Sequence, residues 1–402
     1  MLKQKNDKFW VLANWMQGVG LSGGDRIFIE LTKRWASKMN LEYLISKDGW
    51  GICEREGLKN FHHRIWSSDK LNACGYVLTY PYRTICGILN SFRVPWGKGD
   101  IIYSSSDFYP DSLPAFLVKL RIKSIKWIAG FYLFAPNPFR KDSPYKDIKW
   151  FVGLFYWLSQ WPIYWIVKRF ADIVFVTSEP DKYKFMTKMR GLDKIIVVRG
   201  GVDIAPSETY LNSEKTISFE EKKFDACFLG RFHHQKGTFE LIDIWKIVCQ
   251  RKPDAKLILI GEGPLEKALS EKVDRLGLKD NIIFAGFKNG EPKFEIFKLS
   301  RLVVHPATYD SGGMAAAEAM AWGLPGVSFD LEALKTYYPR GMIKVPVDDL
   351  EQFAREILKL LSDRGYYLKM ANEARRLIVE EWDWDNRAMT IFSRINNIKH
   401  DQ

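Results

Sequence analysis

The sequence has few of the features that mark a secreted, disulfide-bonded or metal-binding protein. Its five cysteines lie among 402 residues without a CxxC pair or a zinc-like cysteine and histidine spacing, and their number is odd. We therefore expect reduced thiols, as in the cytoplasm, and neither a disulfide framework nor a zinc site. The first fifteen residues contain no long apolar run that ends in a small-residue cleavage site. We expect no secretory signal there.

Acidic residues are too few to balance the basic ones. The chain has 48 Asp and Glu against 60 Lys and Arg, which gives a net charge of +12. This excess favours anionic partners, such as nucleotide phosphates, acidic lipid head groups or nucleic acid, and charge alone does not choose among them. A hydrophobic content of 47% and this length are enough for a large core and for two or three domains.

Apolar runs bounded by turn residues alternate with longer amphipathic segments, as in parallel sheets covered by helices. In the first half we expect strands near 8–14, 42–46, 100–104, 125–129 and 173–177, with helices at 25–37 and 111–121. In the second half we expect strands near 224–229, 256–260, 282–285 and 302–304, with helices at 238–250, 264–276 and 313–322. The sequence therefore predicts an α/β fold of two doubly wound domains.

The polar segment 201–218 has neither helical nor strand periodicity and is the expected joint between these domains. We place the boundary near residue 205. The predicted organisation is a first domain at 1–205, a second at 206–380 and a terminal segment at 381–402.

An uncharged, aromatic-rich segment covers residues 150–167. Its length is at the short end of the roughly 17–25 residues that span a membrane, and Ser159, Gln160 and Pro162 interrupt it. Three interpretations stay open: an interfacial helix or hairpin, a buried core helix, or a membrane span.

The segment GRFHHQKG, residues 230–237, joins an expected strand to an expected helix. Amides at a helix N-terminus together with the cations Arg231 and Lys236 suit a diphosphate, although both could be ordinary surface residues. The next such loop, IGEGP at 260–264, contains Gly263. Loops at the carboxyl ends of parallel strands share one crevice, so Gly263 is expected near the same ligand, although Gly and Pro there also suit a helix cap.

Two carboxylates, Asp310 and Glu318, lie within HPATYDSGGMAAAEAMAWGLPGV, residues 305–327. The glycines and the first helical residues between them are Gly312, Gly313, Met314 and Ala315. These residues let a ligand approach the backbone and leave the helix amides unobstructed. The two carboxylates could then accept hydrogen bonds from hydroxyls at opposite ends of a nucleotide-sugar. A small-residue helix packed on a sheet would explain the alanines, but not Glu318.

Taken together, these segments resemble the retaining glycosyltransferases of family 4, the group 1 glycosyl transferases of the GT-B fold. The segments that carry the resemblance, in family order and spacing, are 197–203, 230–237, 253–264, 282–287, 305–327 and 345–358. The resemblance implies two Rossmann-like domains facing across a cleft, an acceptor-binding one and a nucleotide-sugar-binding one. It also implies that the C-terminal segment returns to the first domain as a helix.

The resemblance further implies roles for single residues. Arg231 and Lys236 would hold the diphosphate, Glu318 the ribose, and Asp310 with the amides of 312–315 the sugar and phosphates. The family has two glutamates here, and the first of them is an aspartate in this chain.

The segment GVGLSGGDR, residues 18–26, looks like the family's glycine loop, in which Gly23 and Gly24 approach the donor phosphates and the acceptor. It also contains the dinucleotide fingerprint GxGxxG at Gly18, Gly20 and Gly23, a weaker interpretation because the preceding residues lengthen the turn. Many family members place a histidine near the sugar. The region 131–138 has none, so the first-half residue that contacts the sugar is not identified.

The predicted reaction is transfer of a hexose, with retention, from a UDP-sugar or GDP-sugar to an acceptor, without metal or cofactor. Arg231 and Lys236 can neutralise the leaving diphosphate, and the DWD motif at 383–385 is set aside because it lies in the terminal segment. The alternatives are a GT-B epimerase or phosphorylase, or a non-catalytic nucleotide-sugar-binding protein. We expect a lipid-linked or glycan acceptor, a peripheral position on the cytoplasmic face of an anionic membrane, and no nucleic acid partner.

Overall fold

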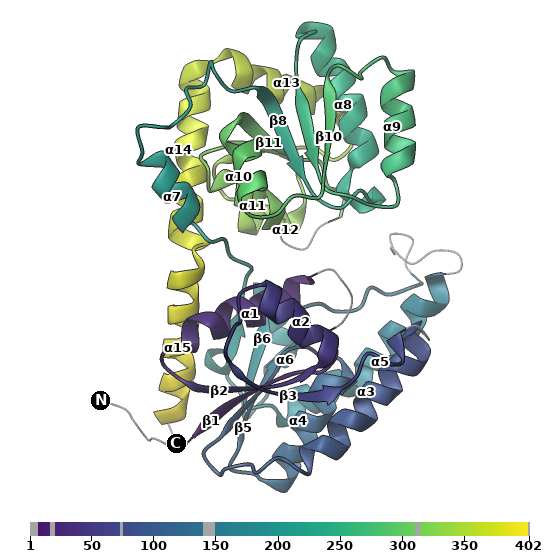
Figure 1. Ribbon diagram of the computed structural model, residues 1–402, viewed down its shortest axis with the longest axis vertical. Helices are drawn as coiled ribbons and strands as arrows, with labels where there is room; N and C mark the ends of the chain where they lie inside the picture. Colours follow the sequence, from purple (N-terminus) through teal and green to yellow (C-terminus); the bar gives the residue numbers. More distant parts are fainter. Residues whose placement is uncertain (1–6, 17–20, 73–74, 140–148, 310–313, 401–402) are drawn as a thin grey trace. The chain divides into compact units, whose positions relative to one another are not determined.

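The computed structural model describes residues 7–16, 21–72, 75–139, 149–309 and 314–400. The chain forms two compact units, drawn in Figure 1. The first contains the chain up to Gly200 together with the segment from Ala388 onward, and the second is Gly201–Arg387. Each unit contains one parallel sheet with helices on both faces, so the predicted α/β class is confirmed.

The first sheet has seven parallel strands in the order β3-β2-β1-β4-β5-β6-β7. They are β1 (Lys8–Ala13), β2 (Asn40–Ser46), β3 (His62–Ser67), β4 (Ile101–Ser104), β5 (Lys126–Gly130), β6 (Ile173–Val176) and β7 (Ile195–Val197). The central strands read as continuous apolar runs because both of their faces are covered.

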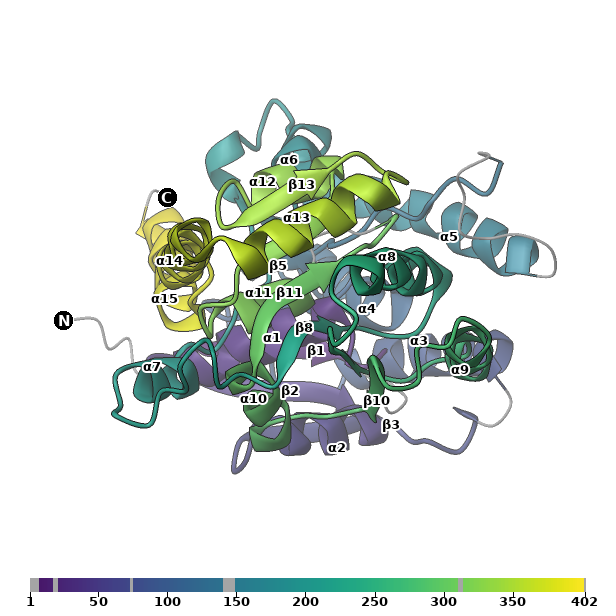
Figure 2. The ribbon, with the colours of Figure 1, turned by 90° about the horizontal axis from the view of Figure 1, so that it is seen from above.

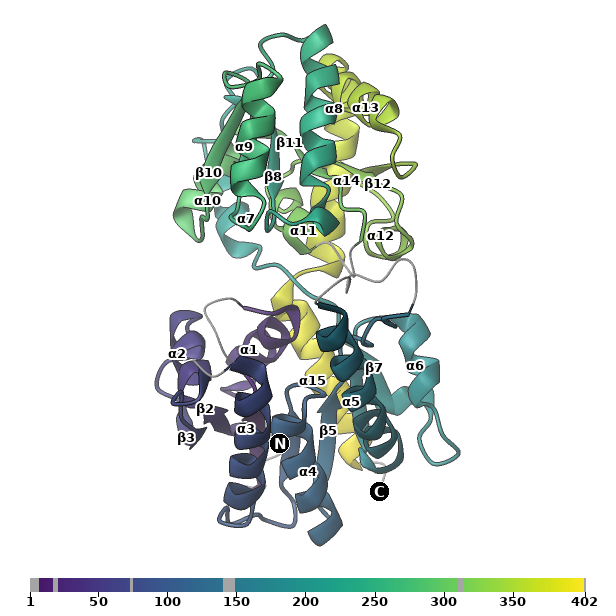
Figure 3. The same ribbon diagram turned by 90° about the vertical axis from the view of Figure 1, so that its right-hand side faces the viewer.

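The helices of this unit are α1 (Gly23–Trp35), α2 (Lys47–Arg55), α3 (Gly75–Ser91), α4 (Tyr109–Arg121), α5 (Lys149–Phe170) and α6 (Glu179–Phe185). The neighbours α3, α4 and α5 lie on one face of the sheet, as Figure 3 shows. The terminal helix α15 (Trp384–His400) joins this unit from Ala388, whose carbonyl accepts a hydrogen bond from Trp35 Nε1 at 2.9 Å.

The second sheet has six parallel strands in the order β10-β9-β8-β11-β12-β13. They are β8 (Phe224–Leu229), β9 (Leu257–Ile260), β10 (Ile282–Gly286), β11 (Ser300–His305), β12 (Gly326–Phe329) and β13 (Met342–Val345). The helices are α7 (Ala205–Leu211), α8 (Thr238–Arg251), α9 (Glu266–Arg275), α10 (Glu291–Lys298), α11 (Met314–Met320), α12 (Glu332–Tyr337), α13 (Leu350–Ser362) and α14 (Arg364–Glu381). Helix α7 forms inside the segment for which no periodicity was found.

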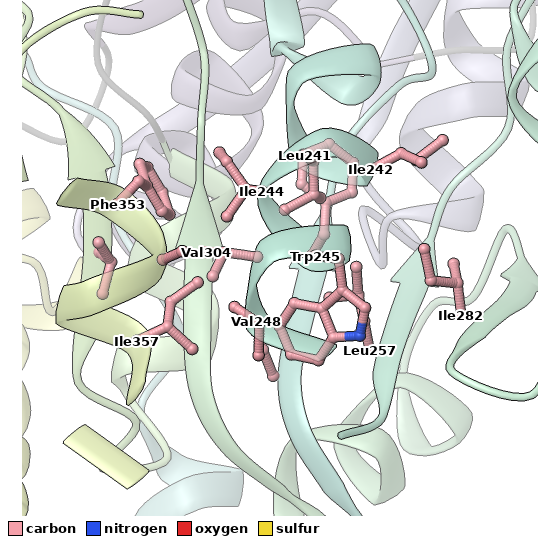
Figure 4. Packing of buried hydrophobic residues seen from close by; sticks show 14 of the residues in the cluster. Leu241, Ile242, Ile244, Trp245, Val248, Leu257, Ile282, Val304, Phe353 and Ile357 are labelled. Carbon is pink, nitrogen blue, oxygen red and sulfur yellow. The ribbon is translucent and has the colours of Figure 1, made fainter. Parts of the chain in front are cut away.

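Two apolar cores lie on opposite faces of the second sheet. Helices α8, α9 and α13 close one of them, which is centred on Trp245, and α10, α11 and α14 close the other (Figure 2). Figure 4 shows how side chains from α8, α13 and the strands pack in the first core. This packing holds the helices rigidly against the sheet.

Each strand order reverses once, between β1 and β4 in the first sheet and between β8 and β11 in the second. In an open parallel sheet, ligands bind outside the carboxyl ends of the strands at such a reversal. In the second unit, the loops at this place are 230–237 and the segment after His305. The sequence predicted both of these segments to be parts of a ligand-binding site.

Helix α5 has one buried and one exposed face. Ile163 and Val167 are buried, whereas an apolar stripe at helical spacing is exposed: Phe151, Phe155, Leu158, Trp161 and Trp165. Gln160 is also buried, and it donates hydrogen bonds to Asp107 Oδ2 (2.7 Å) and to the Leu133 carbonyl (2.8 Å). We call the five exposed residues Phe151, Phe155, Leu158, Trp161 and Trp165 the α5 stripe.

In the part of the chain that the structure describes, no helix has the length and hydropathy needed to cross a membrane.

Candidate functional site

The loops that follow β8, β9, β10 and β11 are joined into one ridge at the carboxyl edge of the second sheet. Four main-chain hydrogen bonds of 3.0–3.1 Å connect them: Gly230 N to Ile260 O, Phe232 N to Glu262 O, Gly261 N to Gly286 O, and Thr308 N to Gln235 O. A ridge built from backbone is rigid and does not depend on the side chains that it carries.

Glycines make this close approach of the loops possible. Gly237 has φ +63°, and a Cβ built on it would lie 1.8 Å from the Pro306 carbonyl oxygen. A Cβ on Gly263 would lie 2.4 Å from the Phe232 carbonyl oxygen. Gly263, expected near the donor, therefore has a packing role as well, because its loop presses directly on the loop after β8.

The predicted cations Arg231 and Lys236 both lie on the loop between β8 and α8. The Arg231 side chain is exposed and forms no hydrogen bond or ion pair with the described residues. Lys236 is half-buried and directly precedes Gly237, which is the N-cap of α8 and supplies no side-chain cap. The first amides of a fourteen-residue helix and two cations thus occupy one short loop, an arrangement that favours bound anions.

The carboxylate segment is only partly described. Asp310, Gly312 and Gly313 lie outside the described residues, and Met314 and Ala315 are the first residues of α11. The alanines 316, 317 and 319 are fully buried in the core that α14 closes, so they are small for packing reasons. The packing interpretation of this helix was therefore correct for the alanines.

Glu318, on the same helix, pairs with a residue that the sequence reasoning missed. Its Oε2 accepts a hydrogen bond from Nζ of Lys293, which is on α10. Lys293 is 9% exposed and Glu318 22% exposed at the side chain, so the pair is shielded from water on most sides. Lys293 follows Gly290 by three residues at the start of a short helix. No periodic signal connects it with a carboxylate 25 positions later.

In the first unit, Gly23 and Gly24 are the first residues of α1. Ser22 caps this helix in a reciprocal capping box with Asp25, and burial raises the pKa of the Asp25 carboxyl. A Cβ on Gly24 would lie 2.9 Å from the Tyr132 ring. The other glycines of the fingerprint, Gly18 and Gly20, lie outside the described residues.

A second missed feature is a buried polar cluster at the β1/β4 reversal. The fully buried Arg83 donates to the Asp48 carboxylate at 2.8 and 3.0 Å and to the Met16 carbonyl at 2.8 Å. Asp111 accepts a hydrogen bond from the Trp15 amide at 2.8 Å. Burial raises the pKa of Asp111 to about 7. These side chains hold the backbone of residues 14–16, which follow β1, and the run SSSDFYPD at 104–111 was the signal available in the sequence.

The DWD motif has a structural role. Asp383 Oδ2 accepts a hydrogen bond from the Asn386 amide at 3.0 Å at the start of α15, and Asp383 pairs with Val202 in an isolated parallel bridge. Among the residues with described positions, no three His, Cys, Asp or Glu side chains gather closely enough to hold a metal ion.

Comparison with known proteins agrees with this geometry. Residues 211–377 match the family model of glycosyl transferases group 1. The chain is 32% identical over 181 residues to a lipopolysaccharide core biosynthesis mannosyltransferase of Rhizobium meliloti, covering 42% of this chain and 51% of that protein. It is 37% identical over 177 residues to the mannosylfructose-phosphate synthase of Agrobacterium fabrum, covering 40% of this chain and 38% of that one. The aligned stretch spans about half or less of each relative.

Solved structures resemble the whole chain. The Anabaena protein HepE, in complex with UDP and glucose, matches with a TM-score of 0.68 and 16% identity, over 97% of this chain and 100% of that one. The sucrose-phosphate synthase of Thermosynechococcus elongatus matches with a TM-score of 0.69 and 16% identity, over 99% and 100%. At such identity these structures support the fold alone, and the predicted GT-B fold is confirmed. The predicted resemblance to the group 1 glycosyl transferases is therefore confirmed for residues 211–377, which make up most of the second unit.

Proposed function

We propose that the protein is a retaining glycosyltransferase that moves a hexose from a nucleotide diphosphate sugar to an acceptor. The observation that carries this proposal is the loop 230–237. It places Arg231, Lys236 and the N-terminus of α8 at the β8/β11 reversal of a group 1 glycosyl transferase unit. The UDP bound in HepE supports a donor of the same class.

The proposed chemistry is stabilisation of a leaving diphosphate. As the bond between the sugar and the donor phosphate breaks, negative charge collects on the phosphate oxygens. Arg231, Lys236 and the α8 amides would neutralise that charge without a metal. A phosphate oxygen of the donor would then assist attack by the acceptor on the same face of the sugar, so that no protein nucleophile is needed.

We expect slow donor hydrolysis, and faster transfer once an acceptor is present, when UDP-sugars and GDP-sugars are supplied one at a time in EDTA. Release of the nucleoside diphosphate measures both, and NMR of the product would show the retained anomeric configuration. Donor binding without turnover would indicate a non-catalytic protein, and conversion to another nucleotide-sugar would indicate an epimerase. Activity that EDTA abolishes and manganese restores would contradict the metal-free proposal.

Glu318 is proposed to accept hydrogen bonds from the ribose hydroxyls, with Lys293 holding its carboxylate in place. Without Lys293, the Glu318 carboxylate is no longer held toward the ribose, and a hydrogen bond to such a charged group is worth about 1.5–3 kcal/mol. We therefore expect Lys293→Met to weaken nucleoside diphosphate binding by about tenfold. The decisive measurement is calorimetry with the 2′,3′-dideoxy analogue, which lacks both ribose hydroxyls. The wild type should bind the analogue more weakly than the parent nucleotide, whereas Glu318→Gln should bind the two almost equally. Lys298→Met, which removes a lysine paired with Glu291 and Glu295 on the same helix, is the control. A wild type indifferent to the missing hydroxyls would exclude this role.

The acceptor is proposed to be lipid-linked and reached from a membrane surface through the α5 stripe. Exposed aromatic side chains on one face, with the basic residues Lys168 and Arg169 at the helix end, suit an interfacial helix. In flotation with anionic liposomes, we expect a variant with Phe151, Trp161 and Trp165 changed to Ser to partition about tenfold less than wild type. Serines at Val347 and Leu368, exposed apolar positions of the second unit, are the control. Equal flotation of both variants would remove the support for a lipid acceptor.

A further inference from the structure

A pocket of about 320 Å³ lies in the first unit, at the amino ends of strands β4, β5 and β6. This is the sheet edge opposite to the carboxyl ends of the strands. Its apolar lining includes Ile101, Ile128, Ile173, Met189 and Ile395 of α15. Neither the proposed donor site nor the proposed α5 stripe uses these residues.

Five cations line this pocket against one carboxylate. They are Lys119, Lys126, Arg169, Arg190 and Lys194, and the carboxylate is that of Asp172. Asp172 is already engaged, since it accepts hydrogen bonds from Lys119 Nζ at 2.7–3.0 Å and from the Trp127 amide at 2.7 Å. With five cations and one carboxylate among its lining residues, the pocket carries a net positive charge.

The contacts of the individual cations agree with this excess of positive charge. Arg190 is 4% exposed and donates only to main-chain carbonyls, those of Val167, Ala171 and Phe185. Neither Arg169 nor Lys194 pairs with a carboxylate among the described residues. Burial lowers the pKa of Lys126, Asp172 raises it in part, and the nearby Lys119 and Lys194 lower it again. Cations that crowd each other in this way favour binding of an anion.

The surroundings of the pocket indicate which anion fits. Arg169 follows Trp165 by four residues, so the α5 stripe runs along its helix directly to the pocket rim. Met189, another lining residue, is 83% exposed. A ligand with a phosphate among the cations and an apolar portion on the apolar lining would satisfy both surfaces.

We propose that this pocket binds the phosphate group of an anionic phospholipid. The choice of a lipid over a free phosphate rests on the proposed membrane contact of α5, whereas the phosphate preference rests on the five cations alone. The bound head group would hold the amino edge of the first sheet at the membrane surface. None of the pocket residues belongs to the donor-binding ridge, so the pocket would attach the enzyme without taking part in the transfer.

The test uses a lipid that dissolves as a monomer, so that it does not depend on membrane binding by α5. We expect the full chain to bind dihexanoyl phosphatidic acid, measured calorimetrically, and to bind dihexanoyl phosphatidylcholine and inorganic phosphate much more weakly. A Lys126→Gln, Lys194→Gln variant should lose about tenfold or more in affinity, because two cations near the phosphate are removed. Lys59→Gln with Lys98→Gln removes the same charge from exposed lysines of this unit outside the pocket.

The outcomes separate the two proposals. Equal affinity of the pocket variant and its charge-matched control would overturn the site. Inorganic phosphate that binds as tightly as the short lipid would overturn the lipid assignment. Monomeric lipid binding that needs Lys126 and Lys194, in a protein that does not float with liposomes, would support the pocket while removing the proposed membrane contact of the α5 stripe.

Discussion

A variant with both Arg231 and Lys236 changed to Ala should lose nucleoside diphosphate binding by roughly a hundredfold or more. Each charge-assisted bond to a phosphate is worth about 1.5–3 kcal/mol, and about 1.4 kcal/mol corresponds to a factor of ten. Each single substitution should cost tenfold or more. The fold should persist, because Arg231 is exposed and the loop is held by main-chain hydrogen bonds. Titration calorimetry with UDP and GDP measures the loss.

The matched control removes two cations from α8, the helix that follows the loop 230–237. Lys246 and Arg251 are exposed on α8, and Arg251 is its last residue. Changing both to Ala alters the net charge equally, but leaves the N-terminus of α8 as it is. If this control weakens binding as much as the Arg231 and Lys236 pair does, the effect is one of overall charge, and the diphosphate is not held on the loop 230–237.

Gly237→Ala should lower the free energy of unfolding by about 3 kcal/mol or more and also weaken nucleotide binding. A left-handed conformation costs a residue with a Cβ about 1–2 kcal/mol. Here the Cβ would also lie 1.8 Å from the Pro306 carbonyl oxygen, so the loops after β8 and β11 would have to separate. Urea denaturation followed by tryptophan fluorescence measures the stability, and calorimetry measures the binding.

Gly277→Ala isolates the part of this effect that comes from backbone conformation. Gly277 has φ +70°, close to the +63° of Gly237, but a Cβ built on it would meet no atom within 4 Å. We expect a loss of about 1 kcal/mol and unchanged nucleotide affinity for this control. Similar losses in the two variants would show that the contact between the loops is soft, and that the ridge does not position the phosphates.

Strands with a strong local signal could be predicted from the sequence. The predicted strand at 224–229 has the bounds of β8, because lysines precede it and a glycine ends it. Strand β3 was missed because it is an edge strand whose first four residues are exposed, which leaves no apolar run. Strands β12 and β13 were missed because each has only four residues and a polar residue, Ser328 or Lys344, interrupts its apolar run. The equally short β6 and β9 are apolar throughout and were predicted.

Some features of the candidate site could be predicted from the sequence and others could not. The position of Arg231 and Lys236 between β8 and α8 was predictable because strand, glycine, cation and helix start follow each other within one short segment. The Lys293–Glu318 pair and the Arg83–Asp48 pair join residues on separate helices, 25 and 35 positions apart. Only the tertiary packing brings these partners together. A single sequence carries no signal for such pairs.

The ridge in the second unit also affects how specificity can change. Its loops are joined through amides and carbonyls, whereas the side chains along it, such as Phe287 and Tyr309, are exposed. Substitutions at these positions leave the supporting hydrogen bonds intact. If the ridge binds the donor as proposed, related enzymes could diverge in sugar and base preference by exchanging side chains on an unchanged backbone.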